Sequence, residues 1–552
     1  MNPINSHSGI QEPLPPTPKR NRLKEAATVV CTGRDVTPYY NTNSPLLDLP
    51  ELIQLKIIRC LGLREITRLA KVCRYFRNLV KQNNALGRAW NRRFPSPHLD
   101  QLKAAIKTKD EQQLRDWLAP FANKGTVESL IEHRKNIHFP VQLLFTNSQL
   151  MSLCREFELV ETLEITHGAG VNEASFSPDG RHLVTASSDH TAKIYCWEAN
   201  GSWQEKATIT HDRLVLSASF SPDGHYLVSV CQDGTAKIYG LEDNGSWEEK
   251  ACISHKNYLN SATFSADSRR VVTHSSYNTV KIIARRDNGS WEVKEFCHGN
   301  QIYSPKLSPD GRHMAILHIM DNVVEIHGQL AEGLWVVTSI IQPEANAFQA
   351  NFSADSCHLV LSTYSNHAAI IFNLQADGSW KEMDTIKHDE LIKSANFSAD
   401  CRHVLTVYKG GMVKIHSQNA GSWGEKARVE HSEEVISASF SADCQHVVTI
   451  SDAIAKISSL QADGSWALKA RIVHQDEVVS ATFSADACHV LTASIDGVVK
   501  IYGLEISESW LQKAVIQKGT ELTAASFSPD SRNVMTLGDY KKVRITELRK
   551  KN

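Results

Sequence analysis

The chain has 552 residues, which is too long for one hydrophobic core and predicts more than one domain. Its 60 Lys and Arg nearly balance 61 Asp and Glu, so the chain as a whole has no bulk attraction to nucleic acid or to a membrane surface. No apolar run approaches the roughly 18 residues of a membrane helix. The twelve cysteines lack Cys-x-x-Cys spacing and are typical of reduced thiols in an intracellular protein.

Residues 1–45 are rich in Pro, Asn, Ser and Thr, which predicts a disordered tail. Within this tail, the stretch from Leu14 to Arg20 has three open interpretations: a proline-directed phosphorylation site, part of a basic import signal, or a solvated segment without function.

From residue 46 to residue 94, apolar residues recur at the spacing of short amphipathic helices. Pro50 fits a helix start, and Gly62 fits a break between two helices. Residues 49–94 hold eleven Lys or Arg against two Glu, a net charge of +9 that leaves about −10 for the rest of the chain. Such a basic excess suits an acidic partner surface.

This segment resembles an F-box, in the run from Leu49 to Ile53, in the Val72-Cys73-Arg74-Tyr75-Phe76-Arg77 run and at Trp90. The resemblance implies binding to the Skp-type adaptor of SCF ubiquitin ligases. It assigns this contact to Leu49, Pro50, Leu52, Ile53, Ile57, Leu61, Leu69, Val72 and Phe76. Nucleic-acid binding by the basic residues is the alternative, which the apolar pattern disfavours.

Residues 95–156 are expected to form a helical connector between two domains, because their apolar residues also fall three and four apart. The connector either holds the F-box at a fixed angle to the following domain or is a small subdomain without a special role. The expected domains are therefore a tail (1–45), an F-box (46–94), this connector (95–156) and a repeat domain (157–552).

The repeat domain is recognised by a phenylalanine that precedes Ser-x-Asp and returns every 43 to 45 residues, with Leu307 at the one place where it is missing. A fixed period of this length, with four short strands per unit, indicates the blades of a β-propeller. A tryptophan recurs in the same phase, which predicts packing between blades. The phenylalanines are Phe176, Phe220, Phe264, Phe352, Phe397, Phe440, Phe483 and Phe527, and the tryptophans are Trp203, Trp247, Trp291, Trp335, Trp380, Trp423, Trp466 and Trp510.

The units resemble WD repeats over residues 157–548. A histidine that matches the family pattern recurs at His167, His211, His255, His298, His388, His431 and His474, and an aspartate of the later hairpin occurs at Asp189, Asp233 and Asp496. The Trp-Asp pair that names the family is replaced, for example by Tyr239-Gly240. The family's hydrogen-bonded tetrad is therefore expected to be incomplete here.

Nine copies of the inner three strands predict a nine-bladed ring, with seven or eight blades as the alternative. The chain ends on a third strand, Lys542–Thr546, so the outer strand of the last blade is expected from residues 157–167, which removes an exposed sheet edge. The fourth copy, around Leu307, is expected to be irregular.

No phosphate-binding loop, zinc-protease motif or nucleophile elbow occurs, so we expect no catalytic residues and no cofactor. Four cysteines lie beside histidines near successive first hairpins. Each pair sits on a different blade, whereas zinc needs converging ligands, so we expect repeat duplication and no metal. These pairs contain Cys357, Cys401, Cys444 and Cys488.

The loops that lead from one blade to the next vary between copies, which makes them the candidate binding rim. Three consecutive loops carry acidic pairs that would attract a basic segment of a protein substrate; a merely solvated set of loops is the alternative. The candidate residues are Asp389, Glu390, Glu433, Glu434, Asp476 and Glu477, together with Arg213, Lys256 and Tyr258.

The two resemblances together imply a non-catalytic substrate receptor of an SCF-type ubiquitin ligase, with a Skp-type adaptor, the cullin core and a target protein as partners. The alternative is a protein-interaction scaffold outside any ligase. Such a receptor is expected in the cytoplasm or nucleus of a eukaryotic cell, either as a eukaryotic protein or as a bacterial effector that acts in a host.

Overall fold

The structure is a computed structural model that describes residues 139–551, except 199–200, 276–278, 298–301, 303–304, 319–320, 330–334, 420 and 506. Before residue 139 it describes residues 54, 66, 69–70, 72, 74–82, 106, 110–118, 124–132 and 134. The chain divides into two compact units, residues 1–58 and 59–552. In the first unit only Gln54 is described, in a helical conformation and buried. The structural description that follows concerns the second unit.

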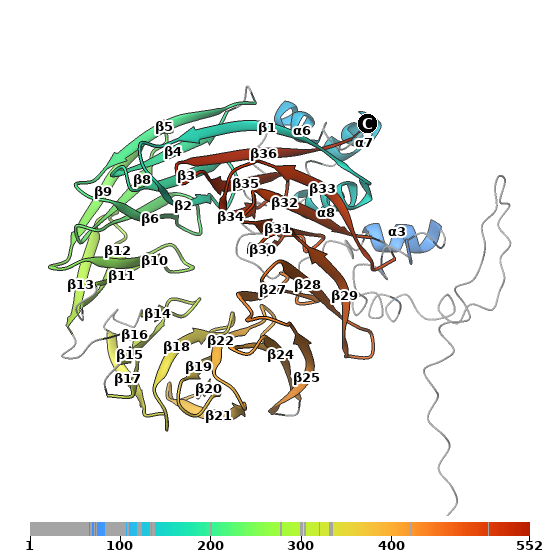
Figure 1. Ribbon diagram of the computed structural model, residues 1–552. Coiled ribbons are helices and arrows are strands. Elements are labelled where there is room, and N and C mark those ends of the chain that lie inside the picture. The colour runs from blue at the N-terminus through green and yellow to red at the C-terminus, as the bar shows by residue number, and fades with distance from the viewer. Residues whose placement is uncertain are drawn as a thin grey trace, which may run out of the picture. The chain divides into compact units, whose positions relative to one another are not determined.

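The dominant feature is a ring of blades that follow one another in chain order (Figure 1). In the part of the chain that the structure describes, the strands form nine four-stranded antiparallel sheets. We number the blades 1 to 9 from β2 onward, and the four strands of each blade run from the innermost to the outermost. The prediction of nine blades is therefore confirmed, and the alternatives of seven or eight blades are wrong.

The strands of blades 1 to 8 follow each other without interruption. They are β2 (Val171–Phe176), β3 (His182–Ser187), β4 (Thr191–Trp197) and β5 (Trp203–Thr210); β6 (Val215–Phe220), β7 (Tyr226–Cys231), β8 (Thr235–Leu241) and β9 (Trp247–Ser254); β10 (Leu259–Phe264), β11 (Arg270–Ser275), β12 (Thr279–Arg285) and β13 (Trp291–Cys297); β14 (Lys306–Leu307), β15 (His313–His318), β16 (Val323–Gln329) and β17 (Trp335–Ile341); β18 (Ala347–Phe352), β19 (His358–Thr363), β20 (Ala368–Leu374) and β21 (Trp380–Lys387); β22 (Ile392–Phe397), β23 (His403–Tyr408), β24 (Met412–Asn419) and β25 (Ser422–Glu430); β26 (Ser437–Phe440), β27 (His446–Ser451), β28 (Ile454–Leu460) and β29 (Trp466–Val473); β30 (Val478–Phe483), β31 (His489–Ser494), β32 (Val498–Leu504) and β33 (Trp510–Gln517). The fourth blade is irregular, as predicted, because its described inner strand β14 has two residues.

Blade 9 closes the ring with two distant parts of the chain. It contains β34 (Leu522–Phe527), β35 (Asn533–Gly538), β36 (Lys542–Lys550) and, as its outermost strand, β1 (Phe157–Thr166). β1 pairs with β36 from Phe157↔Lys550 to Thr166↔Lys542, so the predicted closure is confirmed (Figure 1). Glu164 accepts hydrogen bonds from Lys542 and Arg544 of β36, both at 2.7 Å, and these bonds lower its pKa to about 2.

Each blade is held between its two neighbours, and the second strands show this most clearly. In β7, Leu227, Val228, Val230 and even Ser229 are all buried. Both faces of such a strand are covered by adjacent sheets, so its side chains do not alternate between core and solvent. Outer strands keep the alternation: β5 exposes most residues and buries Trp203 and Ile209.

The recurring Ser-x-Asp turn is explained by its own hydrogen bonds. In blade 2, the Ser221 hydroxyl accepts the Tyr226 amide at 2.9 Å, and the Asp223 carboxylate accepts the His225 amide at 3.0 Å. Gly224 follows with φ +74°, a conformation that costs glycine little. The turn is thus fixed locally, which is why the motif is visible in the sequence of every blade.

The recurring histidine anchors the loop that enters the blade in blades 1, 2, 3, 7 and 8. In five blades its Nε2 lies 2.8 Å from a hydroxyl of the second strand, as in the His211–Ser229 pair. In blade 1, His167 Nδ1 also lies 2.9 Å from Asp189. Tyr195 takes the place of the family's tryptophan and donates to Glu205 of its own blade at 2.9 Å, outside the histidine network.

Three described helices of the connector pack against the ring: α6 (Glu111–Leu118), α7 (Lys124–Ile131) and α8 (Phe139–Leu153). Leu114, Val127 and Leu143 form one buried cluster with Ala487, in the first hairpin of blade 8. From α8, Asn147 Oδ1 accepts two hydrogen bonds from the buried guanidinium of Arg532, at 2.8 and 3.1 Å. None of the described helices combines the length and hydropathy that a membrane crossing needs.

We predict that Asn147→Ala destabilises the protein by about 1–3 kcal/mol, because the buried Arg532 guanidinium loses this acceptor. Asn147→Asp is the matched control, since it keeps an oxygen at this position. Chemical unfolding of the full chain measures the free energy of unfolding of both variants. An Asn147→Ala midpoint equal to that of the unmutated protein would contradict the prediction.

Burial of the recurring histidines predicts acid sensitivity. Burial lowers the pKa of His211, His255, His431 and His474 to about 4, so the unfolded chain binds more protons than the folded one between pH 6.5 and 4. Stability is therefore lost as the pH falls through this window, by up to about 1 kcal/mol per pH unit for each histidine. The measurement is the thermal midpoint at pH 7 and pH 5. His474→Gln removes one buried histidine and should reduce the difference between the two thermal midpoints. An unchanged difference would contradict the assignment of the acid sensitivity to the buried histidines.

Candidate functional site

The described part of the predicted F-box centres on helix α3 (Arg74–Gln82). Val72, just before it, is 69% exposed, and Tyr75 is 42% exposed. Phe76, Leu79 and Val80 are buried. The helix therefore has one side that packs inside the domain and another that is open to a partner.

The predicted adaptor-binding residues divide accordingly. Val72 is accessible, Leu69 is partly buried, and Phe76 is 3% exposed, which assigns Phe76 to the packing of the domain itself. The other predicted residues lie outside the described part of the chain: Leu49, Pro50, Leu52, Ile53, Ile57 and Leu61.

Strands alternate in direction within a blade, so successive hairpins and loops lie on opposite faces of the ring. We call the face with the hairpins between first and second strands the lower face, and the face with the loops that join consecutive blades the upper face. The connector helices contact the lower face: Ser148 of α8 lies 3.3 Å from Cys488, and Asn147 contacts Asp530, both next to first hairpins. The predicted binding rim lies on the upper face.

All six predicted rim carboxylates are exposed on three consecutive blades of the upper face. Asp389 and Glu390 enter blade 6, Glu433 and Glu434 enter blade 7, and Asp476 and Glu477 enter blade 8. We call these six residues the acidic sector. Asp452, exposed in the second hairpin of blade 7, extends it on the same face.

Two contacts position parts of the acidic sector. Lys393 Nζ of β22 lies 3.2 Å from Glu434 Oε1 and donates to the Val435 carbonyl at 3.1 Å, which ties blade 6 to blade 7. The Glu390 carboxylate lies over Gly410, where a Cβ atom would fall 2.0 Å from Oε2. Sequence reasoning missed Gly410, although the Gly410-Gly411 pair between two strands was a visible signal.

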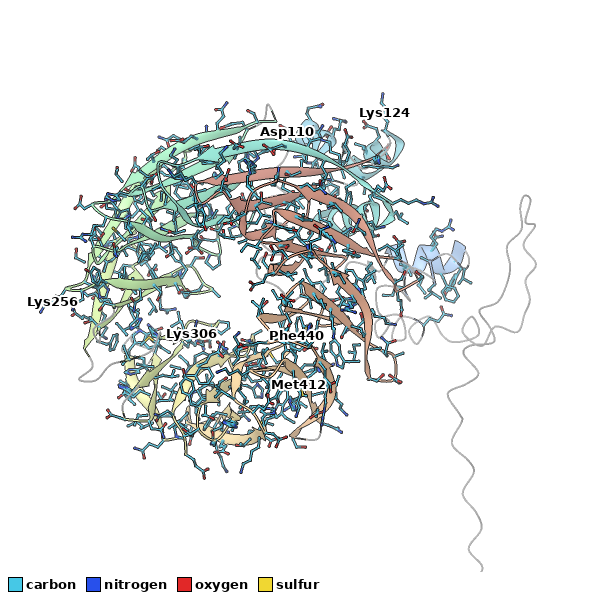
Figure 2. All side chains as sticks on the ribbon, in the orientation of Figure 1. Asp110, Lys124, Lys256, Lys306, Met412 and Phe440 are labelled. Carbon is cyan, nitrogen blue, oxygen red and sulfur yellow. The ribbon has the colours of Figure 1, made fainter. Side chains whose placement is uncertain are left out.

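The remaining predicted rim residues lie elsewhere on the same face. Arg213 enters blade 2, and Lys256 and Tyr258 enter blade 3, all exposed. Figure 2 shows Lys256 pointing outward from the ring. The structure therefore does not gather the nine predicted residues into one site: six form the acidic sector on blades 6–8, and three lie on blades 2–3.

The histidines beside the recurring cysteines have a packing role. His403 and His446 each meet the tryptophan of the next blade edge-on, with ring centroids 5.7 Å and 5.2 Å from Trp466 and Trp510. Their pairing with hydroxyls is equally local, since His446 Nδ1 lies 2.7 Å from Ser459 Oγ. Trp466 and Trp510, two of the tryptophans that recur in blades 1 to 8, thus pack against the preceding blade, as the sequence predicted.

Comparison with known families identifies two kinds of domain. The F-box domain family matches residues 46–85, and the WD domain, G-beta repeat, matches residues 157–196, 203–240 and 467–503. A search of curated proteins found no match.

Similar solved structures include the C-terminal WD40 domain of Sif2, with 15% identity over 72% of this chain and 99% of that chain and a TM-score of 0.48. Sqt1 from Chaetomium thermophilum has 13% identity over 72% of this chain and 100% of that chain, also with a TM-score of 0.48. Sqt1 of Saccharomyces cerevisiae has 13% identity over 60% and 96%, with a TM-score of 0.47. These likenesses carry no argument about function.

The two family matches agree with the structure, which has nine blades, a Ser-x-Asp turn in the first hairpins and recurring histidines paired with hydroxyls of the second strands. The chain has an F-box domain at residues 46–85, followed by WD40 repeats that form a β-propeller.

Proposed function

We propose that this protein is the substrate-recognition subunit of an SCF-type ubiquitin ligase. The observation that carries the proposal is the presence of an F-box and a WD40 propeller in one chain, an architecture typical of such receptors. Proteins of this architecture are typically non-catalytic adaptors. The F-box binds a Skp-type adaptor, and the propeller presents a target protein to the ligase.

Adaptor binding is proposed for the exposed side of the F-box. Val72 presents an apolar side chain to solvent next to the partly exposed Tyr75. An exposed valine beside an aromatic residue is a suitable contact for an apolar partner surface, whereas Phe76 keeps the domain folded. On sequence grounds, the adaptor contact is also proposed for Leu49, Pro50, Leu52, Ile53, Ile57 and Leu61.

Substrate binding is proposed for the upper face. The connector occupies the lower face beneath blades 7 to 9, while the acidic sector on blades 6–8 remains exposed. Carboxylates grouped on one rim favour a basic segment of the target and raise its rate of encounter. Arg213, Lys256 and Tyr258 provide a second, separate contact region for the same target.

The competing function is a protein-interaction scaffold outside any ligase. A scaffold would use the same propeller and exposed rim as the receptor, and would differ only in that its F-box binds no adaptor. A scaffold needs no adaptor, so substitutions on the exposed side of the F-box would leave its interactions unchanged.

Val72→Asp in the full chain should abolish capture of a purified Skp-type adaptor, because a charge would enter an apolar contact. Asn78→Asp, at an exposed polar position of α3, is the matched control and should retain binding. The triple variant Leu49→Ala/Pro50→Ala/Ile53→Ala tests the part of the surface inferred from sequence. A folded unmutated chain that fails to bind the adaptor would leave the scaffold function.

Glu433→Lys/Asp476→Lys should weaken binding of a labelled Lys- and Arg-rich peptide about tenfold, since two favourable charge interactions become repulsive. Fluorescence anisotropy measures the affinity, and added salt should reduce the difference. Asp212→Lys/Glu344→Lys is the control, because both residues are exposed in the same type of loop on blades 2 and 5. Equal loss in the two variants would contradict a specific role for the acidic sector.

A further inference from the structure

Blade 2 contains a group of side chains that the proposed function does not use. His211, Cys231 and Asp233 each offer a ligand atom, and these atoms all lie within 4.8 Å of one another. His211 and Cys231 are buried, and Asp233 is partly exposed in the second hairpin of the blade on the upper face. The three residues combine nitrogen, sulfur and oxygen donors.

The same place in blades 1, 3, 7 and 8 carries serine, which shows what the cysteine changes. Ser451 and Ser494 donate their hydroxyls to loop carbonyls, at 2.8 and 3.0 Å. Cys231 instead places its sulfur atom within 4.8 Å of a carboxylate oxygen of Asp233. Blade 2 therefore has a thiol near a carboxylate at the place where blades 7 and 8 have a serine hydroxyl bonded to a loop carbonyl.

The imidazole completes this arrangement. His211 Nε2 lies 2.8 Å from Ser229 Oγ, which leaves Nδ1 turned toward the group. Thr235 Oγ1 lies 3.4 Å from Nδ1 but donates to Asp233 Oδ1 at 2.6 Å. In blade 1 the equivalent Nδ1 of His167 is bonded to Asp189 at 2.9 Å. In blade 2 Nδ1 thus makes a longer contact than in blade 1.

We propose that His211, Cys231 and Asp233 form a binding site for Zn²⁺ on the upper face of blade 2. Imidazole, thiolate and carboxylate are the ligands that zinc uses, and three protein ligands with a fourth open position are a known arrangement. In a tetrahedral site the ligand atoms lie about 3.3–3.6 Å apart, so a shift of roughly 1 Å closes the group around the ion. The ion replaces the thiol proton, which passes to solvent, and reaches the site past Asp233. The site is independent of the proposed ligase function.

The test uses the full chain, with Zn²⁺ competed against a chromophoric chelator. Cys231→Ser carries the residue that blades 1, 3, 7 and 8 have at this place, and Asp233→Asn is a second variant. Cys252→Ser, at an exposed cysteine of β9 in the same blade, controls for other thiols. We expect the unmutated protein and Cys252→Ser to bind one more equivalent of Zn²⁺ than the other two variants, or to bind it at least tenfold more tightly.

Co²⁺ provides a readout specific to the thiolate. Its sulfur-to-metal charge-transfer band should appear with the unmutated protein and Cys252→Ser and be absent with Cys231→Ser. The thermal midpoint without metal shows whether each variant is folded. Zn²⁺ affinity and Co²⁺ spectra that are the same in folded Cys231→Ser or Asp233→Asn as in the unmutated protein would overturn the proposal, as would no binding by the unmutated protein.

Discussion

The structure depends on one constraint: every sheet must have both faces covered by other sheets. The second strands make this plain, since Ser229 is as fully buried as its apolar neighbours Val228 and Val230. A linear stack of such blades would leave two apolar faces in water. The ring removes both, and it closes because β1 crosses to β36 and forms the outer strand of blade 9. The strand pairing and the ionic contacts of Glu164 together join the first and last parts of the propeller.

Closure also determines where the connector lies. Helix α8 ends at Leu153, only four residues before β1 begins, so the strand that closes the ring holds the helix close to blades 8 and 9. The buried Asn147–Arg532 contact and the cluster around Ala487 then place the helices on the lower face. The upper face keeps its loops exposed. This division gives the proposed receptor one face for its connection to the F-box and another for a target.

The upper face is chemically uneven because its loops are free to differ. Strand positions repeat since each must pack against neighbouring blades, whereas the loops carry no such requirement. Carboxylates accumulate on blades 6–8, and Arg213, Lys256 and Tyr258 occupy blades 2–3. A single exchange of serine for cysteine in blade 2 likewise creates a distinct chemical group without altering the strand that carries it.

The sequence by itself determined the features that depend on local chemistry. The period of the blades, the Ser-x-Asp turns and the tryptophan packing were all predicted, because each arises within about 45 residues through turn hydrogen bonds and strand patterning. The number of blades and the closing strand were also predictable, since the repeats could be counted and the missing strand located.

Only the tertiary structure decided which side chains meet across blades and which faces they occupy. It buried Phe76 while exposing Val72, separated the predicted rim into two regions, and placed Glu390 over Gly410. It also brought His211 next to Cys231 and Asp233, twenty and more residues away. These contacts depend on the twist and spacing of packed sheets, which no local pattern encodes.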